Sequence, residues 1–135
     1  MRFPYTILPA KRGKCYKPLV PIVLNYKKTH RITPGIMALI DSGADVCFCS
    51  KKIGEYLNIS FKKIKRVEKF LAANNKFFLT QPEAVNLKVA GKELRCEFHF
   101  TDVLPELTPI ILGQVGFFDK FRIIFDVKKG YIEVK

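Results

Sequence analysis

The stretch that decides the fold runs from Ala38 to Asp45 and reads Ala-Leu-Ile-Asp-Ser-Gly-Ala-Asp. Its first three residues are apolar and typical of a buried β-strand, so the carboxylate of Asp41 is expected at a strand end beside buried surface. The residues that follow, Ser42, Gly43 and Ala44, are small, which lets the backbone turn tightly and leaves room for another chain to approach. Taken alone, an Asp-Ser-Gly triplet of this kind favours an Asx turn, in which Asp41 bonds only its own backbone.

A second segment has a similar layout. Pro109–Gly113 is an apolar strand that ends at a glycine, and Gln114–Phe121 has apolar residues at helical spacing, which predicts two helical turns. After the first segment, Ser50 is placed to cap a short helix over Lys51–Leu57. Both segments are therefore expected to form a buried strand, a glycine turn and a short helix, although a glycine after a strand is common in any β protein.

The rest of the chain alternates apolar and polar residues with many β-branched side chains, which predicts short strands and few helices. An all-β fold of this kind is a sandwich or a partly closed barrel. The expected strands are Leu19–Tyr26, Gly35–Ile40, Asp45–Cys49, Phe61–Val67, Phe70–Ala73, Lys76–Leu79, Glu83–Val89, Glu93–Phe100, Pro109–Leu112, Arg122–Asp126 and Tyr131–Val134.

The chain has 135 residues, of which 48% are hydrophobic, so it is long and apolar enough for the core of one domain and unlike a disordered protein. No apolar run approaches the roughly 18 residues of a membrane span, and the N-terminal residues lack the pattern of a secretory signal. We therefore expect a cytoplasmic protein without membrane contact. Its cysteines (Cys15, Cys47, Cys49 and Cys96) lack the spacing of a metal site, and we expect buried, reduced thiols.

The charge is strongly positive, with 24 basic and 12 acidic residues and a net charge of +12. Such a surplus permits binding to nucleic acid or another polyanion. The basic residues are scattered along the sequence, however, and a lysine-rich solvated surface explains them equally well. Charge by itself identifies no partner.

Ala38 to Asp45 resembles the active-site signature of the retropepsin-like aspartic proteases. Pro109–Gly113, followed by Gln114–Phe121, resembles the second conserved region of that family, an apolar turn with glycine packed beneath the active site. The resemblance extends over 19–134. It implies a closed or partly closed β-barrel with one or two short helices, in a single domain over residues 1–135 whose first 18 residues form an extension or edge strand.

The activity that the resemblance implies is that of an aspartic endopeptidase, in which two carboxylates share a proton and activate a water, without metal, cofactor or covalent intermediate. No second Asp-Ser/Thr-Gly triplet occurs in the chain, so the second carboxylate is expected from another copy, in a homodimer with one Asp41 per subunit. The resemblance further implies that Ser42 bonds across the two-fold axis and that Gly43 and Ala44 line the cleft floor. Ile111, Leu112 and Gly113 are the supporting turn.

Substrate contacts are implied for Asp45, which would accept bonds from substrate backbone, and for a mobile hairpin, the flap, at Ala72, Ala73, Asn74 and Asn75. Two features depart from retroviral members. Gln114 stands where those proteins have an arginine, and the flap has no glycine, although asparagine tolerates the left-handed backbone of a tight turn. An ordinary hairpin without a gating role is the alternative.

Two other functions remain open at this point. One is a catalytically silent module that keeps the fold for binding or dimerisation. The other is a basic β-domain that binds nucleic acid through lysines and aromatic residues. For assembly, Tyr131–Val134 is expected to be an edge strand, and Thr6–Leu8 to pair with it or with its counterpart in a second copy. The resemblance to the retropepsin-like proteases implies an extended peptide substrate with apolar residues at the cut.

Overall fold

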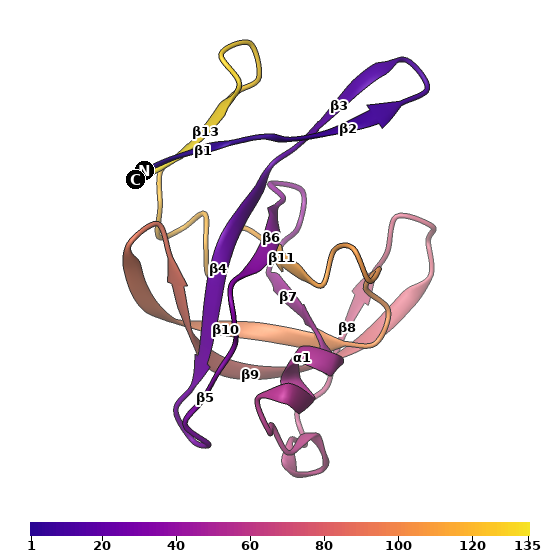
Figure 1. Cartoon of the computed structure of the whole chain (residues 1–135). Coiled ribbons are helices and arrows are strands. Elements are labelled where there is room, and N and C mark those ends of the chain that lie inside the picture. Colours follow the sequence, from indigo (N-terminus) through magenta and orange to yellow (C-terminus); the bar gives the residue numbers. More distant parts are fainter.

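Six strands close into a barrel in the computed structural model, which describes residues 1–135 (Figure 1). Around the barrel, each strand is hydrogen-bonded to the next, and the circuit is closed because β4 pairs with β9, with Leu24 opposite Leu87. In that order the strands are β4 (Leu19–Tyr26), β6 (Ile36–Ile40), β11 (Ile110–Leu112), β7 (Cys47–Ser50), β10 (Lys92–Thr101) and β9 (Phe77–Val89). The expected all-β barrel is confirmed, and it is closed.

The other strands extend or flank this barrel. β5 (Arg31–Ile32) pairs with β4, and β8 (Glu68–Leu71) forms a hairpin with β9. β1 (Arg2–Pro4), β13 (Tyr131–Val134) and β12 (Ile123–Asp126) form a separate three-stranded sheet, while β2 (Thr6–Ala10) and β3 (Gly13–Lys17) pair only with each other. The single α-helix, α1 (Lys51–Tyr56), has six residues, and no helix of the chain is long and apolar enough to cross a membrane.

The core lies inside the barrel and follows from the alternation of side chains along each strand. On β4, every second side chain from Val20 to Tyr26 is buried, and on β9 the same holds from Val85 to Val89. β10 contributes two fully buried phenylalanines, Phe98 and Phe100. Burial of this set is the main favourable term for folding, at about 25 cal/mol per Å² of apolar surface.

α1 begins where the sequence predicts. The Ser50 hydroxyl accepts a hydrogen bond from the backbone N–H of Lys52 at 3.2 Å, which satisfies one of the free donors of the first turn. The helix packs on the barrel through Gly54, where a side chain would collide with the ring of Phe61 and lie 3.1 Å from Phe100. The glycine therefore allows the close approach of α1 to the barrel.

Two expected elements are wrong. Phe61–Val67 is not a strand: Phe61–Lys63 is one 3₁₀ turn (η1), and the Gln81 side-chain amide donates to the carbonyls of Phe61 and Ile64 at 2.9 and 3.0 Å. The Gln81 side chain thus satisfies two carbonyl groups that, in a strand, would accept hydrogen bonds from a neighbouring strand. Gln114–Phe121 is a series of turns and not a helix, because Gly116 has φ +109° and Val115 forms a β-bridge with Val46.

Two strand pairings also differ from expectation. Lys76–Leu79 and Glu83–Val89 belong to one continuous strand, β9, because β8 pairs with its residues 77–80 and β10 with its residues 81–89, including Pro82. Thr6–Leu8 does not pair with the C-terminal strand. It belongs to the β2–β3 hairpin. The expectation that Tyr131–Val134 is an edge strand is also wrong, because β13 lies between β1 and β12, with Phe3 and Phe125 on either side of Ile132.

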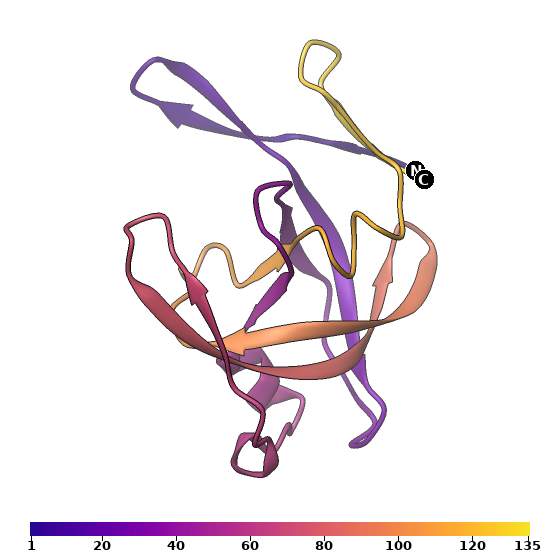
Figure 2. The ribbon, with the colours of Figure 1, turned by 180° about the vertical axis from the view of Figure 1, so that it is seen from behind.

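Different loops and helices lie at the two ends of the barrel. Figures 1 and 2 both show the loop between β6 and β7 and the β8–β9 hairpin rising from the same end. α1, η1 and the β4–β5 turn lie at the opposite end. The barrel thus separates the Asp41 loop from a second surface, formed by the β4–β5 turn and the α1–η1 segment.

Candidate active site

Asp41 is the first residue after β6, and the strand ladder holds its backbone. Leu39 and Ile40 pair in parallel with Ile111 and Leu112 of β11, and the backbone N–H of Asp41 donates to the Leu112 carbonyl at 3.0 Å. The carboxylate is therefore presented at the end of two adjacent buried strands. The side chain is half-buried and lies within 4.0 Å of no basic group, so no ion pair within the chain neutralises it.

The loop after Asp41 is a tight turn. The Gly43 N–H donates to Oδ1 of Asp41 at 2.9 Å, and the Ala44 N–H donates to the Asp41 carbonyl at 3.2 Å. This is the Asx-type turn that the sequence left open, and it fixes the orientation of the carboxylate. Oδ1 is used in this bond, which leaves Oδ2 available. Ser42 and Gly43 are exposed, so the carboxylate and this turn are open to a partner or ligand.

Gly113 supports the loop from below. A Cβ at this position would overlap the carbonyl oxygen of Val46 and lie 2.7 Å from that of Ala44. The Gly113 N–H points to the sulfur of Cys47, 3.4 Å away. Only glycine permits this contact, so the Ile111–Gly113 turn and the Asp41 loop are packed backbone to backbone.

Gln114 ties the two segments together. Its backbone N–H donates to the Ala44 carbonyl and its side-chain amide to the Ser42 carbonyl, at 2.9 and 2.7 Å. The Val115 N–H donates to the Asp45 carbonyl at 2.9 Å. Asp45 is thus held through its backbone, and its exposed side chain forms no ion pair. The role of Gln114 as a clamp on the loop was not part of the sequence prediction.

The expected flap residues form the tip of the β8–β9 hairpin. The Ala72 N–H donates to the Lys76 carbonyl at 2.9 Å, the Asn75 N–H to the Ala72 carbonyl at 3.0 Å, and Asn75 adopts φ +63°. Asparagine therefore takes the place of glycine in this turn. The chain places Ala72–Asn75 at the same end of the barrel as Asp41, and no hydrogen bond joins the hairpin tip to the Asp41 loop.

The base of the hairpin packs on the strand that follows the Asp41 loop. Phe48 of β7 lies 5.1 Å from Phe70 of β8 and 5.6 Å from Phe78 of β9, measured between ring centroids. His99 of β10 lies edge-on to Phe70 at 5.1 Å. Sequence reasoning missed this aromatic layer. The only local signal was a phenylalanine on each of three predicted strands, and the pairing register was needed to bring these rings together.

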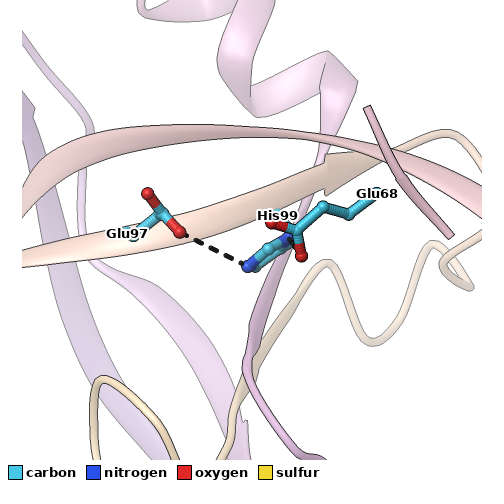
Figure 3. Close-up of side chains that lie close together, drawn as sticks. All are labelled: Glu68, Glu97 and His99. Atoms are coloured by element: carbon cyan, nitrogen blue, oxygen red, sulfur yellow. Dashed lines mark ion pairs between the residues drawn. The ribbon is translucent and has the colours of Figure 1, made fainter. Parts of the chain in front are cut away.

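His99 is the centre of a charged cluster at this base (Figure 3). Its ring is 3% exposed, and Nδ1 and Nε2 lie 3.7 Å from carboxylate oxygens of Glu68 and Glu97, respectively. The Thr80 hydroxyl donates to the Glu68 carbonyl at 3.1 Å and lies 3.2 Å from Nδ1, which therefore carries the proton of the neutral ring. Burial lowers the pKa of His99, while the two glutamates oppose that shift.

The same three side chains are those whose spacing would allow a metal ion, with ligand atoms within 4.8 Å of one another. Arg66 already supplies the positive charge here, because its guanidinium bridges Glu68 and Glu97, at 3.0 Å from the latter. The two carboxylates also face different nitrogens of the ring, and one ion can bind only one of these. The cluster is best described as an ion-pair network that joins β8 to β10.

Neither a scan against models of protein families nor a search of curated proteins finds a match for this chain. Solved structures do match. A retropepsin-like aspartic protease from Rickettsia conorii is 18% identical with a TM-score of 0.62, covering 98% of this chain and 97% of the other. The retroviral protease-like domain of Ddi1 from Leishmania major is 15% identical with a TM-score of 0.60, and 88% of each chain is covered. At such identities, the likeness concerns the fold.

Proposed function

We propose that this chain, whose fold is that of the retropepsin-like aspartic proteases, is an aspartic endopeptidase that works as a homodimer. The observation that carries the proposal is the position of Asp41. Its carboxylate stands at the end of a buried strand and is oriented by its own turn, and its loop packs on Gly113, where a Cβ would overlap the loop backbone. A carboxylate held rigidly at an accessible loop is a suitable general acid or base.

One chain supplies one such carboxylate, and the reaction needs two. An isologous dimer brings the same residue from both subunits to its axis, so two Asp41 carboxylates would face each other. Two like charges at close range do not both ionise easily, and the pair keeps one proton, which is the established behaviour of aspartic protease dyads. The exposed loop residues Ser42 and Gly43 are the part of this chain that would meet the second copy.

In the proposed reaction, the ionised Asp41 takes a proton from a water, and the oxygen of that water attacks the carbonyl carbon of a peptide bond. The protonated Asp41 of the other subunit stabilises the developing oxyanion and then protonates the leaving amine. Asp45 accepts hydrogen bonds from the substrate backbone. The hairpin tip at Ala72–Asn75 closes over the bound substrate. The aromatic residues Phe48, Phe70 and Phe78 at the hairpin base suit a substrate with apolar side chains.

The test is cleavage of a diverse peptide mixture by the purified chain between about pH 4 and 7, where such a dyad titrates. Asp41→Asn keeps the size of the side chain and removes its charge, and we expect it to abolish cleavage. Asp102→Asn is the matched control, because the Asp102 side chain is 78% exposed and pairs with Lys51 at the start of α1, at the opposite end of the barrel from the Asp41 loop. Cleavage is read by mass spectrometry, and the flanking residues of each cut define the substrate preference.

Cuts that persist in Asp41→Asn would disprove the dyad. Absence of cuts from a wild-type chain that is folded and dimeric would instead favour a catalytically silent dimerisation module with the same fold. The dimer itself is measured by sedimentation, and Asp41→Asn is expected to leave it intact, because the substitution is isosteric.

A further inference from the structure

The barrel end opposite Asp41 carries a cluster of basic side chains. Two segments far apart in the sequence supply it: the β4–β5 turn and the stretch that contains η1 (Figures 1 and 2). We call this surface the basic end, and its members are Lys27, Lys28, Arg31, Lys62, Lys63, Lys65 and Arg66. All seven are exposed. The basic runs at 27–31 and 62–66 are visible in the sequence, but only the fold brings them together.

Specific hydrogen bonds hold the two segments side by side. The Thr29 hydroxyl donates to the carbonyl of Leu57 at 2.6 Å, which joins the β4–β5 turn to the end of α1. Gln81 of β9 holds the backbone on both sides of the lysines through the carbonyls of Phe61 and Ile64. The backbone that carries the basic side chains is therefore fixed before any ligand arrives, which reduces the entropy cost of binding.

Most of these charges are not neutralised within the chain. Glu83 pairs with Lys28 at 3.4 Å, and Arg66 bridges Glu68 and Glu97. The remaining five have no carboxylate within 4.0 Å. They are Lys27, Arg31, Lys62, Lys63 and Lys65. An uncompensated group of this size raises the local concentration of an anionic partner.

The basic end contains a pocket. A cavity of about 490 Å³ lies between its two segments, with Lys28, Lys63, Lys65 and Arg66 in its wall. Thr29, Asn58 and Ser60 add neutral polar groups to the lining. The wall also contains the carboxylate of Glu83, which accepts a hydrogen bond from the Tyr26 hydroxyl and pairs with Lys28. Only two of the ten lining residues are hydrophobic, so the cavity suits a charged and hydrogen-bonding group, such as a phosphate with its sugar, and not an acyl chain.

We propose that the basic end binds a single-stranded nucleic acid through its phosphates. A flexible strand can place a nucleotide in the cavity while its neighbouring phosphates lie on the five unpaired charges, and each contact releases counterions. An acidic peptide lacks the regular spacing of phosphates, and a bilayer surface would not enter a polar hollow. The surface lies at the other end of the barrel from Asp41, so this binding does not depend on the proposed protease activity.

The experiment measures fluorescence anisotropy of a labelled single strand of about 20 nucleotides with the full chain, from about 50 to 200 mM salt. If five phosphates are contacted, log Kd rises with log salt with a slope of about 3.5. The triple variant Lys62→Ala, Lys63→Ala, Lys65→Ala is expected to lower that slope by about 2 and to weaken binding roughly 100-fold at 0.1 M salt.

The matched control removes three lysines from the β2–β3 hairpin and its turn, at the other end of the barrel: Lys11→Ala, Lys14→Ala, Lys17→Ala. All three are exposed, so both variants have the same net charge, and the control is expected to keep the wild-type slope. Equal losses in the two variants would overturn the proposal in favour of diffuse charge attraction. Thermal unfolding of both variants shows that each remains folded.

Failure to bind the oligonucleotide at the lowest salt overturns the proposal. Three further probes complete the test: an oligoglutamate peptide, vesicles and the Asp41→Asn variant. Equal binding to an oligoglutamate peptide, or binding only to vesicles that contain phosphatidylserine, assigns the surface to another anionic partner and also overturns it. Asp41→Asn is expected to bind the oligonucleotide as wild type does, so failure of the protease proposal and failure of this one are distinguished.

Discussion

Gly113 lies where the turn after β11 packs against the Asp41 loop. Because this contact leaves no room for a Cβ, the position requires glycine. Its neighbours are the backbone oxygens of Val46 and Ala44. The Ala44 oxygen accepts from the Gln114 N–H, and Val46 forms a β-bridge with Val115 on the same turn. Backbone atoms cannot rotate away as a side chain does. A residue with a Cβ at this position must therefore displace the loop that carries Asp41.

We expect Gly113→Ala to lower the free energy of unfolding by about 2–3 kcal/mol, as overpacking of a tight site does. Any proteolytic activity is expected to fall further than stability explains, because the Asp41 carboxylate moves with the loop. Chemical denaturation measures the first effect. Gly35→Ala is the control: no atom lies within 4 Å of its Cβ and the backbone is not left-handed, so its stability should stay close to wild type.

Among the elements, the β8–β9 hairpin depends on contacts at its base. Phe70 and Phe78 pack on Phe48, while Glu68 and Thr80 surround the imidazole of His99. Arg66 forms ion pairs with Glu68 and Glu97, the two glutamates that lie beside the His99 ring. The tip itself has no hydrogen bond to the Asp41 loop, so the base attaches the hairpin to the barrel. The protonation state of His99 is therefore coupled to the attachment of the proposed flap.

The pKa of His99 is lowered below its ordinary value of 6.5, chiefly by burial. The unfolded chain thus takes up a proton at a higher pH than the folded chain. The contribution of neutral His99 to the free energy of unfolding is therefore complete above pH 6.5. It decreases as the pH falls through and below that value, until the ring is protonated in the folded chain as well. We expect the melting temperature to decrease between pH 7 and 5, and His99→Gln to weaken this dependence.

His30 provides the control for that experiment, because it is exposed in the β4–β5 turn and makes no hydrogen bond or ion pair. His30→Gln should keep the pH dependence of the wild type. If His99→Gln keeps the full pH dependence as well, carboxylates elsewhere in the chain cause it, and the role assigned to His99 is wrong.

For the whole molecule, the proposed reaction makes activity a property of the dimer, because each chain contributes one Asp41. A dimer of one wild-type and one Asp41→Asn chain has a single carboxylate and should be inactive. The variant therefore acts as an inhibitor of the wild type, even though it has no activity of its own. A monomeric enzyme would be unaffected by its presence.

We expect an equal amount of Asp41→Asn, equilibrated with a fixed amount of wild type, to reduce activity to about half, since only one dimer in four is then wild type on both sides. A threefold excess should reduce it to about a quarter. Initial rates of peptide cleavage measure both. Asp102→Asn in the same amounts raises activity instead, because it is expected to be active itself. Rates that do not change on adding Asp41→Asn would rule out the shared site.

The sequence by itself determined the all-β class, the strand that presents Asp41, the turn after it and the cap of α1. These features depend on residues close together in the chain: alternation with period two, small residues after a strand, and a serine before a helix. The same local patterns failed at Gln114–Phe121 and Phe61–Val67, where helical spacing and apolar content suggested regular elements.

Only the tertiary structure decided the rest. Gly116 and the Val46–Val115 bridge replaced the expected helix with turns, and the Gln81 side chain took the place of a strand partner for Phe61 and Ile64. The closure of β4 on β9, the ring of His99 between two glutamates and the basic end likewise join residues distant in sequence. Such contacts depend on register and packing, which a local pattern does not encode.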